Sequence, residues 1–321
     1  MRVLFTGGGG AGSGSLWQQL SSRYDVHFAD ADPSRIPPEI PSDHRHQLPL
    51  ARAAGFVSGL SRVLEKARID VLVPGVDEEL LPIAHARDSG GLPDCRVLMP
   101  ATEDITRCLD KLEFTRRAAD AGLRVPRTER LDQRGEWSAF PCIVKPRTGR
   151  GSAGVGVMPD RRALDGWSMV VPDAQEVIVQ TLISGTEYTV QVVADADGRL
   201  GAIVPVRVHS KRGITVSAIT EAMPAVIAAC RDMHAAFPTA AVVNVQGMLD
   251  AEGSFWPFEV NPRVSTTLCL VVAAGVDPID VFLDSGVSRS AGTVDFITGL
   301  SLERFWDTRI SSSSDGGSHR G

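Results

Sequence analysis

The chain has 321 residues, 43% of them hydrophobic, and a formal net charge of −6. Acidic and basic residues are mixed and form no basic stripe, which argues against a nucleic-acid or anionic-membrane surface. Five widely spaced cysteines indicate neither a disulfide framework nor a CxxC metal site, and no signal peptide or membrane-length apolar run is evident. We therefore expect a soluble, cytoplasmic protein with two or three packed units.

The first hundred residues alternate short apolar runs with helical patterns. The predicted strands are 3–5, 26–29, 71–73 and 97–99, and the predicted helices are 16–20 and 56–67. This βαβ alternation predicts an α/β unit with a parallel sheet and crossover helices. Residues 33–49 contain several prolines, whose fixed φ angles favour a loop.

The pattern changes at Thr102. Apolar residues at helical spacing predict one helix that starts with Thr102 as N-cap and ends before Gly122. Strands rich in β-branched residues follow at 142–144, 177–180, 188–193, 202–206, 242–249 and 255–260, with a helix at 224–237. Turn signals between several of them predict antiparallel pairing in an α+β unit, and the tail 311–321 should be disordered.

The opening stretch VLFTGGGGAGSG runs from a strand into a glycine turn. Gly7, Gly9 and Gly12 satisfy the spacing of a dinucleotide-binding fingerprint, and Asp30 stands near the position of its ribose-binding acid. Four consecutive glycines, however, satisfy nearly any spacing rule. The competing interpretation is a structural or substrate-facing turn that could hold an anion with its free N–H groups.

A stronger phosphate-binding pattern is FPCIVKPRTGRGSAGV, residues 140–155. Lys145 ends an apolar strand and is followed at once by a loop of Gly, Ser, Thr and Arg. A lysine on a rigid strand beside mobile backbone donors can hold a polyphosphate while the loop folds over it. A glycine-rich hairpin with a solvated lysine is the alternative.

A metal-binding pattern follows in FEVNPRVS, residues 258–265. Side chains alternate along a strand, so Glu259 and Asn261 should point to the same face. Their oxygens suit magnesium, which is usually shared with substrate phosphates, and Gln246 could add a third oxygen from the preceding strand. Arg263 at the rim could hold an acyl phosphate or carboxylate. An edge strand with a solvated glutamate is the alternative.

Taken in order, Leu109-Asp110-Lys111, the Lys145 strand with its glycine loop, residues 177–188 and residues 258–265 resemble the ATP-grasp superfamily. The likeness covers roughly residues 1–290 and is greatest to the synthetase halves of the carbamoyl phosphate synthetase large subunit and to stand-alone carboxylate–amine ligases. It implies a Rossmann-like pre-ATP-grasp domain at 1–101 and a two-lobed ATP-grasp domain at 102–300. The lobes divide into about 125–182 and 183–300, followed by an extension at 301–321.

The resemblance also implies roles for individual residues. The nucleotide contacts would come from two lysines, a mobile loop, an adenine-reading hinge, a ribose-binding acid and a histidine: Lys111, Lys145, Thr148, Gly149, Gly151, Ser152, Gly154, Gln180, Thr181, Leu182, Glu187 and His209. Gln246, Glu259 and Asn261 match the magnesium positions, which manganese could also fill, and Gln246 replaces a carboxylate found in many relatives. Lys145 and Arg263 would neutralise charge during the reaction. Apart from the resemblance, His209 would be a loop histidine without a role.

The implied activity is an ADP-forming ligation of a small-molecule carboxylate to an amine through an acyl phosphate, with ATP and magnesium. Two features leave alternatives. The basic pair Lys211-Arg212, in an expected loop at 208–215, fits either an anionic substrate or solvated charge, and Asp77-Glu78-Glu79 fits either the substrate cleft or an acidic helix start. The rival functions are a nucleotide-binding scaffold without turnover and an NAD-dependent oxidoreductase. Dimers are frequent among similar enzymes.

Overall fold

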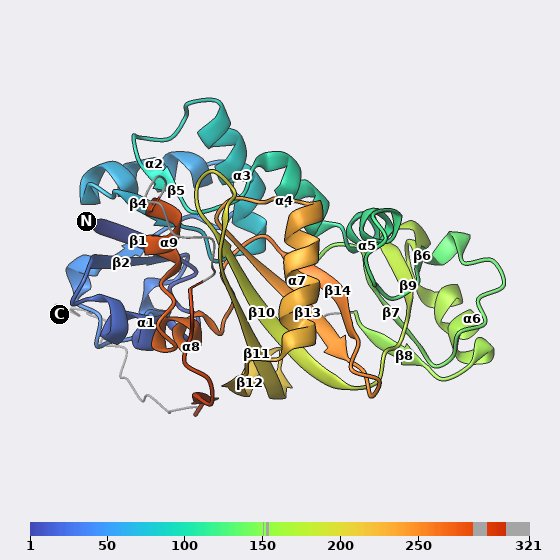
Figure 1. The fold of residues 1–321 in the computed structure, drawn as a ribbon. Helices are drawn as coiled ribbons and strands as arrows, with labels where there is room; N and C mark the ends of the chain where they lie inside the picture. The colour runs from blue at the N-terminus through green and yellow to red at the C-terminus, as the bar shows by residue number, and fades with distance from the viewer. Residues whose placement is uncertain (150, 152–153, 285–293, 306–321) are drawn as a thin grey trace, which may run out of the picture.

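The computed structural model describes residues 1–149, 151, 154–284 and 294–305. Three sheets follow one another across the molecule, with the parallel sheet at one end, a large antiparallel sheet in the centre and a small antiparallel sheet at the other end (Figure 1). The fold is therefore a mixed α/β fold with several sheets. No helix within the described ranges is long and apolar enough to cross a membrane. The expected disordered tail at 311–321 lies outside the described residues.

The first sheet is parallel, as the βαβ alternation predicts. Its order is β3-β2-β1-β4-β5, with bounds Arg2–Thr6 for β1, Asp25–Asp30 for β2, Arg45–Gln47 for β3, Val71–Val73 for β4 and Arg96–Val97 for β5. The crossovers include α1 (Ser13–Leu20) and α2 (Phe56–Ala67), and α3 (Asp77–Asp88) follows β4. Apolar side chains fill both faces of the sheet.

The prediction of a loop over 33–49 is wrong in part. Two short 3-10 turns, Pro33–Arg35 and Ser42–His44, lead into the edge strand β3, which pairs with β2. The prolines stop at Pro41 and resume at Pro49, so the intervening backbone keeps its N–H donors and can bond to the exposed edge of β2.

The central sheet is antiparallel throughout, as predicted. Its order is β14-β13-β10-β11-β12-β15, with bounds Thr186–Ala194 for β10, Leu200–Arg212 for β11, Ile214–Thr220 for β12, Val242–Leu249 for β13, Phe255–Asn261 for β14 and Ser301–Glu303 for β15. The prediction of a loop over 208–215 is wrong, because these residues form the end of β11, a turn at Gly213 and the start of β12. Gly213 has a φ of 72°, which permits the tight turn.

The third sheet has the order β6-β9-β7-β8. Its strands are β6 (Thr128–Arg130), β7 (Cys142–Pro146), β8 (Gly156–Met158) and β9 (Val177–Thr181), and helix α6 (Arg161–Val170) accompanies them. The buried Trp137 and Leu164 fill its small separate core. This sheet therefore forms a lobe with its own hydrophobic contacts.

The single helix predicted from Thr102 is two helices, α4 (Thr102–Leu109) and α5 (Lys111–Asp120). Asp110 has an extended backbone, and its carboxylate accepts hydrogen bonds from the N–H groups of Leu112 and Glu113, so it starts the second helix. Thr102 is not an N-cap. It is the first helical residue, and its hydroxyl donates to Asp88. Gly122 has the expected positive φ beyond the helix end.

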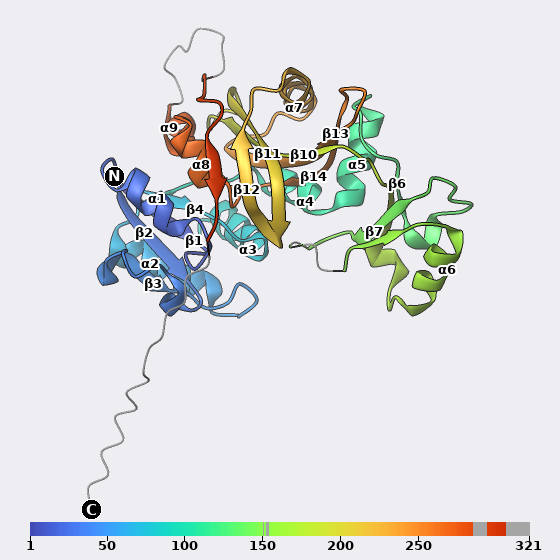
Figure 2. The ribbon, with the colours of Figure 1, turned by 90° about the horizontal axis from the view of Figure 1, so that it is seen from below.

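The two faces of the central sheet have different partners. One face, including Val190, Val245 and Val260, packs against α5 and α7 (Pro224–Ala236). Part of the opposite face packs against α8 (Leu268–Ala273) and α9 (Pro278–Leu283), which also meet the parallel-sheet unit (Figure 2). The remainder of this second face is polar and turns toward the small lobe.

A buried aspartate joins the parallel-sheet unit to α9. Asp277 is 7% exposed, and its carboxylate accepts hydrogen bonds from the Tyr24 hydroxyl at 2.9 Å, from Arg23 at 2.8 Å and from the N–H of Ile279 at 2.9 Å. It therefore caps α9 and holds two side chains that are distant in the sequence.

Replacing Asp277 with Ala should lower the free energy of unfolding by about 1–3 kcal/mol, because the cap of α9 is lost and Tyr24 and Arg23 keep only Asp280 as a carboxylate acceptor. The urea unfolding midpoint measures this loss. The exposed turn residue Asp197 is the control, and its replacement with Ala should change the stability by less than about 0.5 kcal/mol. Equal midpoints for the two variants would contradict the joining role.

Candidate active site

A cleft of about 450 Å³ separates the central sheet from the small lobe. Most of the predicted site residues line it, although they come from distant parts of the sequence: Lys111, Lys145, Thr148, Gly149, Gly151, Gln180, Thr181, Leu182, Glu187, Gln246, Glu259, Asn261 and Arg263. Gly154 and His209 are not among the lining residues, and Ser152 lies outside the described residues. The structure thus brings the lysine strand and the oxygen-bearing strand to one cavity.

Lys145 on β7 is the most deeply buried charged group in this part of the cleft, with 5% exposure. Its ammonium lies 3.4 Å from the carbonyl oxygen of Phe258 on β14 and 4.8 Å from the centre of the Phe258 ring. Burial lowers the pKa of Lys145 to about 8, partly opposed by the nearby Glu259. The small lobe therefore carries a cation directly onto the central sheet.

A second lysine stands at the start of α5. Lys111 is 6% exposed, and its ammonium donates to the carbonyl oxygen of Gly149 at 2.9 Å. Its backbone N–H donates to the carbonyl oxygen of Arg147, whose guanidinium pairs with Asp110. The break between α4 and α5 thus fixes this lysine beside the glycine segment.

A row of side-chain oxygens lies on β13 and β14. In the antiparallel register Gln246 is opposite Glu259, and Asn244 is opposite Asn261, so all four side chains share the cleft face. Asn244 was not predicted, although the alternation along β13 puts it on the same face as Gln246. Its side-chain oxygen accepts a hydrogen bond from Thr189 at 2.7 Å.

The Glu259 carboxylate has no hydrogen-bond partner among the residues that the structure describes, and the charge of Lys145 acts on it. A carboxylate with amide oxygens beside it is a donor set of hard oxygens. This set fits the preference of magnesium for oxygen ligands.

Lys211 occupies a position that the sequence did not predict. Its ammonium pairs with the carboxylate of Glu187 and lies 3.3 Å from the side-chain oxygen of Gln246. The β11–β12 hairpin therefore extends over the cleft and places a cation between a predicted ribose ligand and a predicted metal ligand. His209 is exposed and does not line the cleft; it borders an adjoining surface depression that shares Glu187 and Lys211 with the cleft.

The sequence suggested that Arg263 lies free at the rim of the cleft. In the structure its guanidinium is instead paired with another side chain. Its guanidinium pairs with Asp77, with 3.1 Å between Nη2 and Oδ2, and it also donates to the carbonyl oxygen of Val264 at 2.9 Å. Both side chains of the pair are largely buried. Asp77 begins α3, so this ion pair connects the parallel-sheet unit to a cleft-lining residue. Asp77, Glu78 and Glu79 form the first turn of α3 and do not line the cleft, as the acidic-helix-start interpretation expects.

The predicted hinge lies at the end of β9. The buried Gln180 directs its side-chain amide to Thr128, with 2.7 Å between Nε2 and Oγ1, and the N–H of Thr181 donates to Arg127. Beyond them Leu182 and Ile183 line the cleft in the irregular segment between β9 and β10. The Gln180 side-chain amide is thus engaged by Thr128, and the segment that lines the cleft beyond it has no regular secondary structure.

The opening glycine turn is held by the residue that the dinucleotide interpretation assigned to a ribose. Asp30 accepts a hydrogen bond from the N–H of Gly9 at 2.8 Å, and its other oxygen accepts from the N–H of Asp32 at 3.0 Å. Both oxygens are thus used within the protein. The turn passes close to the carbonyl oxygen of Thr266, which belongs to a cleft-lining residue. A structural or substrate-facing turn is the interpretation that fits.

Comparison with known proteins agrees with this geometry. Residues 173–304 match the family "ATP-grasp in the biosynthetic pathway with Ter operon". The carbamoyl phosphate synthase large chain of Bifidobacterium animalis subsp. lactis is 25% identical over 246 residues, which cover 68% of this chain and 22% of that protein. The chain thus matches less than a quarter of the length of this relative.

Two solved structures have the same fold. Biotin carboxylase from Campylobacter jejuni, as a β,γ-ATP complex, superposes with a TM-score of 0.67 at 15% identity, covering 87% of this chain and 70% of that one. L-amino acid ligase from Bacillus licheniformis gives a TM-score of 0.65 at 16% identity, covering 86% and 71%. The family match, the curated relative and the shared fold all agree with the resemblance of this chain to the ATP-grasp superfamily.

Proposed function

We propose that this protein is an ATP-dependent ligase that joins a carboxylate to an amine or similar nucleophile through an acyl phosphate, releasing ADP and phosphate. The observation that carries the proposal is the meeting of Lys145 with the Glu259 and Asn261 strand in one cleft. A metal-bound triphosphate needs a cation beside its phosphate oxygens and oxygen ligands for its metal. The ammonium and the oxygen-donor set on opposite walls of the cleft would supply them. Relatives named as a carbamoyl phosphate synthase and an L-amino acid ligase support the reaction class.

The magnesium site would consist of Glu259, Asn261 and Gln246, with Asn244 beside them. When bound, magnesium or manganese would neutralise charge on the phosphate oxygens. The residues fit this ion because they offer a carboxylate without a hydrogen-bond partner in the described chain and amide oxygens on the same sheet face.

The protein's own groups would act mainly through position and charge. Lys145 and Lys111 would bind phosphate oxygens, and residues 148–154 would cover them and exclude water from the acyl phosphate. Residues 180–182 would receive the adenine, and Glu187 the ribose, after Lys211 leaves its carboxylate. His209 would approach the nucleotide only if the hairpin end shifts, since it lies outside the cleft.

We assign residues 1–101 to a pre-ATP-grasp domain, 102–300 to the ATP-grasp domain with lobes at about 125–182 and 183–300, and 301–321 to an extension.

The acceptor side would be formed where the parallel-sheet unit meets the cleft. Arg263, fixed by Asp77, would present its guanidinium edge to a carboxylate or acyl phosphate. The glycine turn beside Thr266 would border the same substrate space.

A single assay separates this proposal from its rivals. The protein is incubated with MgATP and pools of amino acids as carboxylate and amine, and ADP is measured with and without hydroxylamine, which traps acyl phosphates as hydroxamates. The ligase predicts ADP that depends on the acceptor pool, with hydroxamate formed. A scaffold predicts nucleotide binding without ADP, and an oxidoreductase predicts a change in nicotinamide fluorescence.

Replacing Glu259 with Gln should reduce ADP formation by about 100-fold or more, because the only acidic donor of the proposed metal site is removed while the side-chain shape is kept. The fold should be retained, as judged by circular dichroism. The exposed Glu252 in the turn between β13 and β14 provides the matched control, and its change to Gln should leave the rate unaffected. Unchanged ADP formation in the Glu259 variant would remove the metal assignment.

The affinity for MgATP should decline as the pH rises above about 8. The buried Lys145 has a pKa lowered to about 8, so the free protein loses this proton in mildly alkaline solution, whereas a bound phosphate favours the charged form. The dissociation constant should then rise by up to about tenfold per pH unit. Calorimetric titrations from pH 7 to 9.5 measure it. Replacing Lys145 with Arg should flatten the profile, and a flat profile in the unaltered protein would contradict the assignment.

A further inference from the structure

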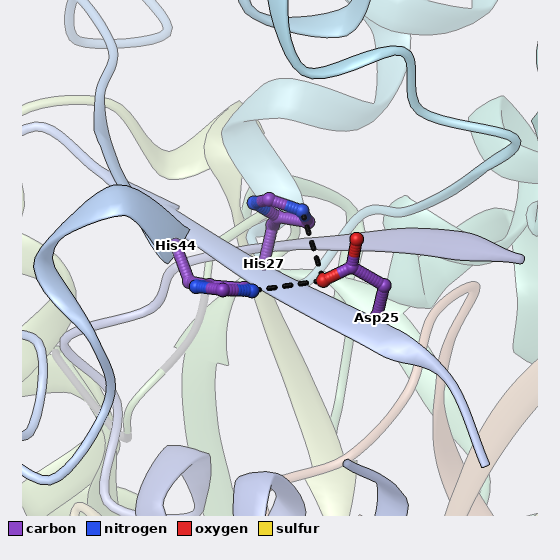
Figure 3. Close-up of side chains that lie close together, drawn as sticks. All are labelled: Asp25, His27 and His44. Atoms are coloured by element: carbon purple, nitrogen blue, oxygen red, sulfur yellow. Dashed lines mark hydrogen bonds and ion pairs between the residues drawn. The ribbon is translucent and has the colours of Figure 1, made fainter. Parts of the chain in front are cut away.

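A cluster of metal-binding side chains lies at the edge of the parallel sheet, apart from the cleft. Asp25 and His27 project from β2, and His44 comes from the 3-10 turn that precedes β3 (Figure 3). One ligand atom from each residue lies within 4.8 Å of the others. None of the three lines the cleft, so the proposed ligase chemistry gives no reason for them to converge.

His27 carries the strongest indication of a ligand. Its side chain is 9% exposed, and its Nε2 atom is buried without a hydrogen-bond partner in the described structure. This atom lies 3.5 Å from Oδ1 of Asp25, which is too far for a good hydrogen bond. A buried polar atom without a hydrogen-bond partner lowers the stability of the fold. This nitrogen is therefore available to a ligand from outside the protein.

The outer neighbours orient both histidines. Nδ1 of His27 lies 2.9 Å from Nε2 of His46, and Nδ1 of His44 lies 3.0 Å from a carboxylate oxygen of Asp43. When each Nδ1 donates its proton outward, each Nε2 presents a lone pair inward. Metal-binding histidines almost always have such a second partner, which fixes the tautomer and the ring orientation.

Asp25 is oriented in the same way. Its Oδ2 accepts a hydrogen bond from Nε of Arg2 at 3.1 Å, which leaves Oδ1 turned toward the two imidazoles. Oδ1 is 2.8 Å from Nε2 of His44. In a tetrahedral zinc site with bonds of about 2.0–2.1 Å, ligand atoms are about 3.3 Å apart. The distances of 2.8 and 3.5 Å lie on either side of this value. The two imidazole rings are stacked with their planes 23° apart, so the histidine side chains would have to turn for both nitrogens to point at one metal.

We propose that Asp25, His27 and His44 bind a divalent transition metal of the zinc class. Two imidazole nitrogens and one carboxylate select zinc, cobalt or nickel over magnesium, whose oxygen-donor site would be the separate one in the cleft. Asp25 and His44 are partly exposed, so a fourth position remains open to water. The bound metal would tie the edge segment 42–47 to β2, which the parallel sheet otherwise holds by a three-residue strand.

Cobalt binding tests the proposal directly. The full chain, without a histidine tag and stripped of metal with a chelator, is titrated with Co²⁺, and the visible d–d absorption of cobalt in a low-coordinate site is recorded. One equivalent should bind, and Zn²⁺ should displace it. Changing His27 or His44 to Gln should weaken Co²⁺ binding by more than about tenfold, and changing Asp43 to Asn or His46 to Leu should weaken it by roughly tenfold, as expected for outer neighbours.

The controls make each result decisive. His85 is exposed on α3, and its change to Gln should leave Co²⁺ binding intact. Circular dichroism of each metal-free variant checks folding, and the partly exposed His44 serves as the test if the His27 variant does not fold. The native chain should also unfold at a higher temperature with Zn²⁺, whereas the His44 variant should not. Absence of a cobalt spectrum in the native chain, or equal affinity in the His44 and His85 variants, would overturn the site.

Discussion

The buried ammonium of Lys145 is the interaction on which the cleft depends. Removing an ammonium from water costs several kcal/mol unless partners compensate it. Here the Phe258 carbonyl and ring compensate in part, and the Glu259 charge adds to them. The lowered pKa of Lys145 shows that this compensation is incomplete in the free protein. An anionic ligand would complete it, which is why phosphate is the chemistry that the cleft suits.

The central sheet makes this arrangement possible because its two faces have different surroundings. One face is covered by helices, whereas the other is apolar at one end and polar at the other end. Strand alternation sends Val245 and Val260 under the helices and Gln246 and Glu259 to the other side. On that other side, α8 and α9 bury the apolar end and leave the polar end open. One sheet thus provides both a hydrophobic contact and the oxygen-lined wall of the cleft. Lys145 of the small lobe faces this wall.

The sequence predicted the parts of the site that local pattern determines. The strand ending at Lys145 and the alternation of Glu259 and Asn261 are readable because each depends on neighbouring residues. Three other features join residues that are far apart in the chain, so no local pattern predicts them. They are the Arg263–Asp77 pair, the Lys211–Glu187 pair and the Asp25 cluster. The same limit explains β3, whose pairing depends on the edge of β2, and the helix break at Asp110, where a carboxylate cap overrides the apolar period.

The central claim is that Lys145 and the Glu259/Asn261 pair close on one triphosphate. A crystal grown with Mn²⁺ and a non-hydrolysable ATP analogue tests it most directly, since manganese is located by its anomalous scattering. The account predicts a manganese peak at bonding distance from oxygens of Glu259 and Asn261, with the γ-phosphate in contact with the Lys145 ammonium. A nucleotide bound at the opening glycine turn, or manganese away from β14, would contradict it.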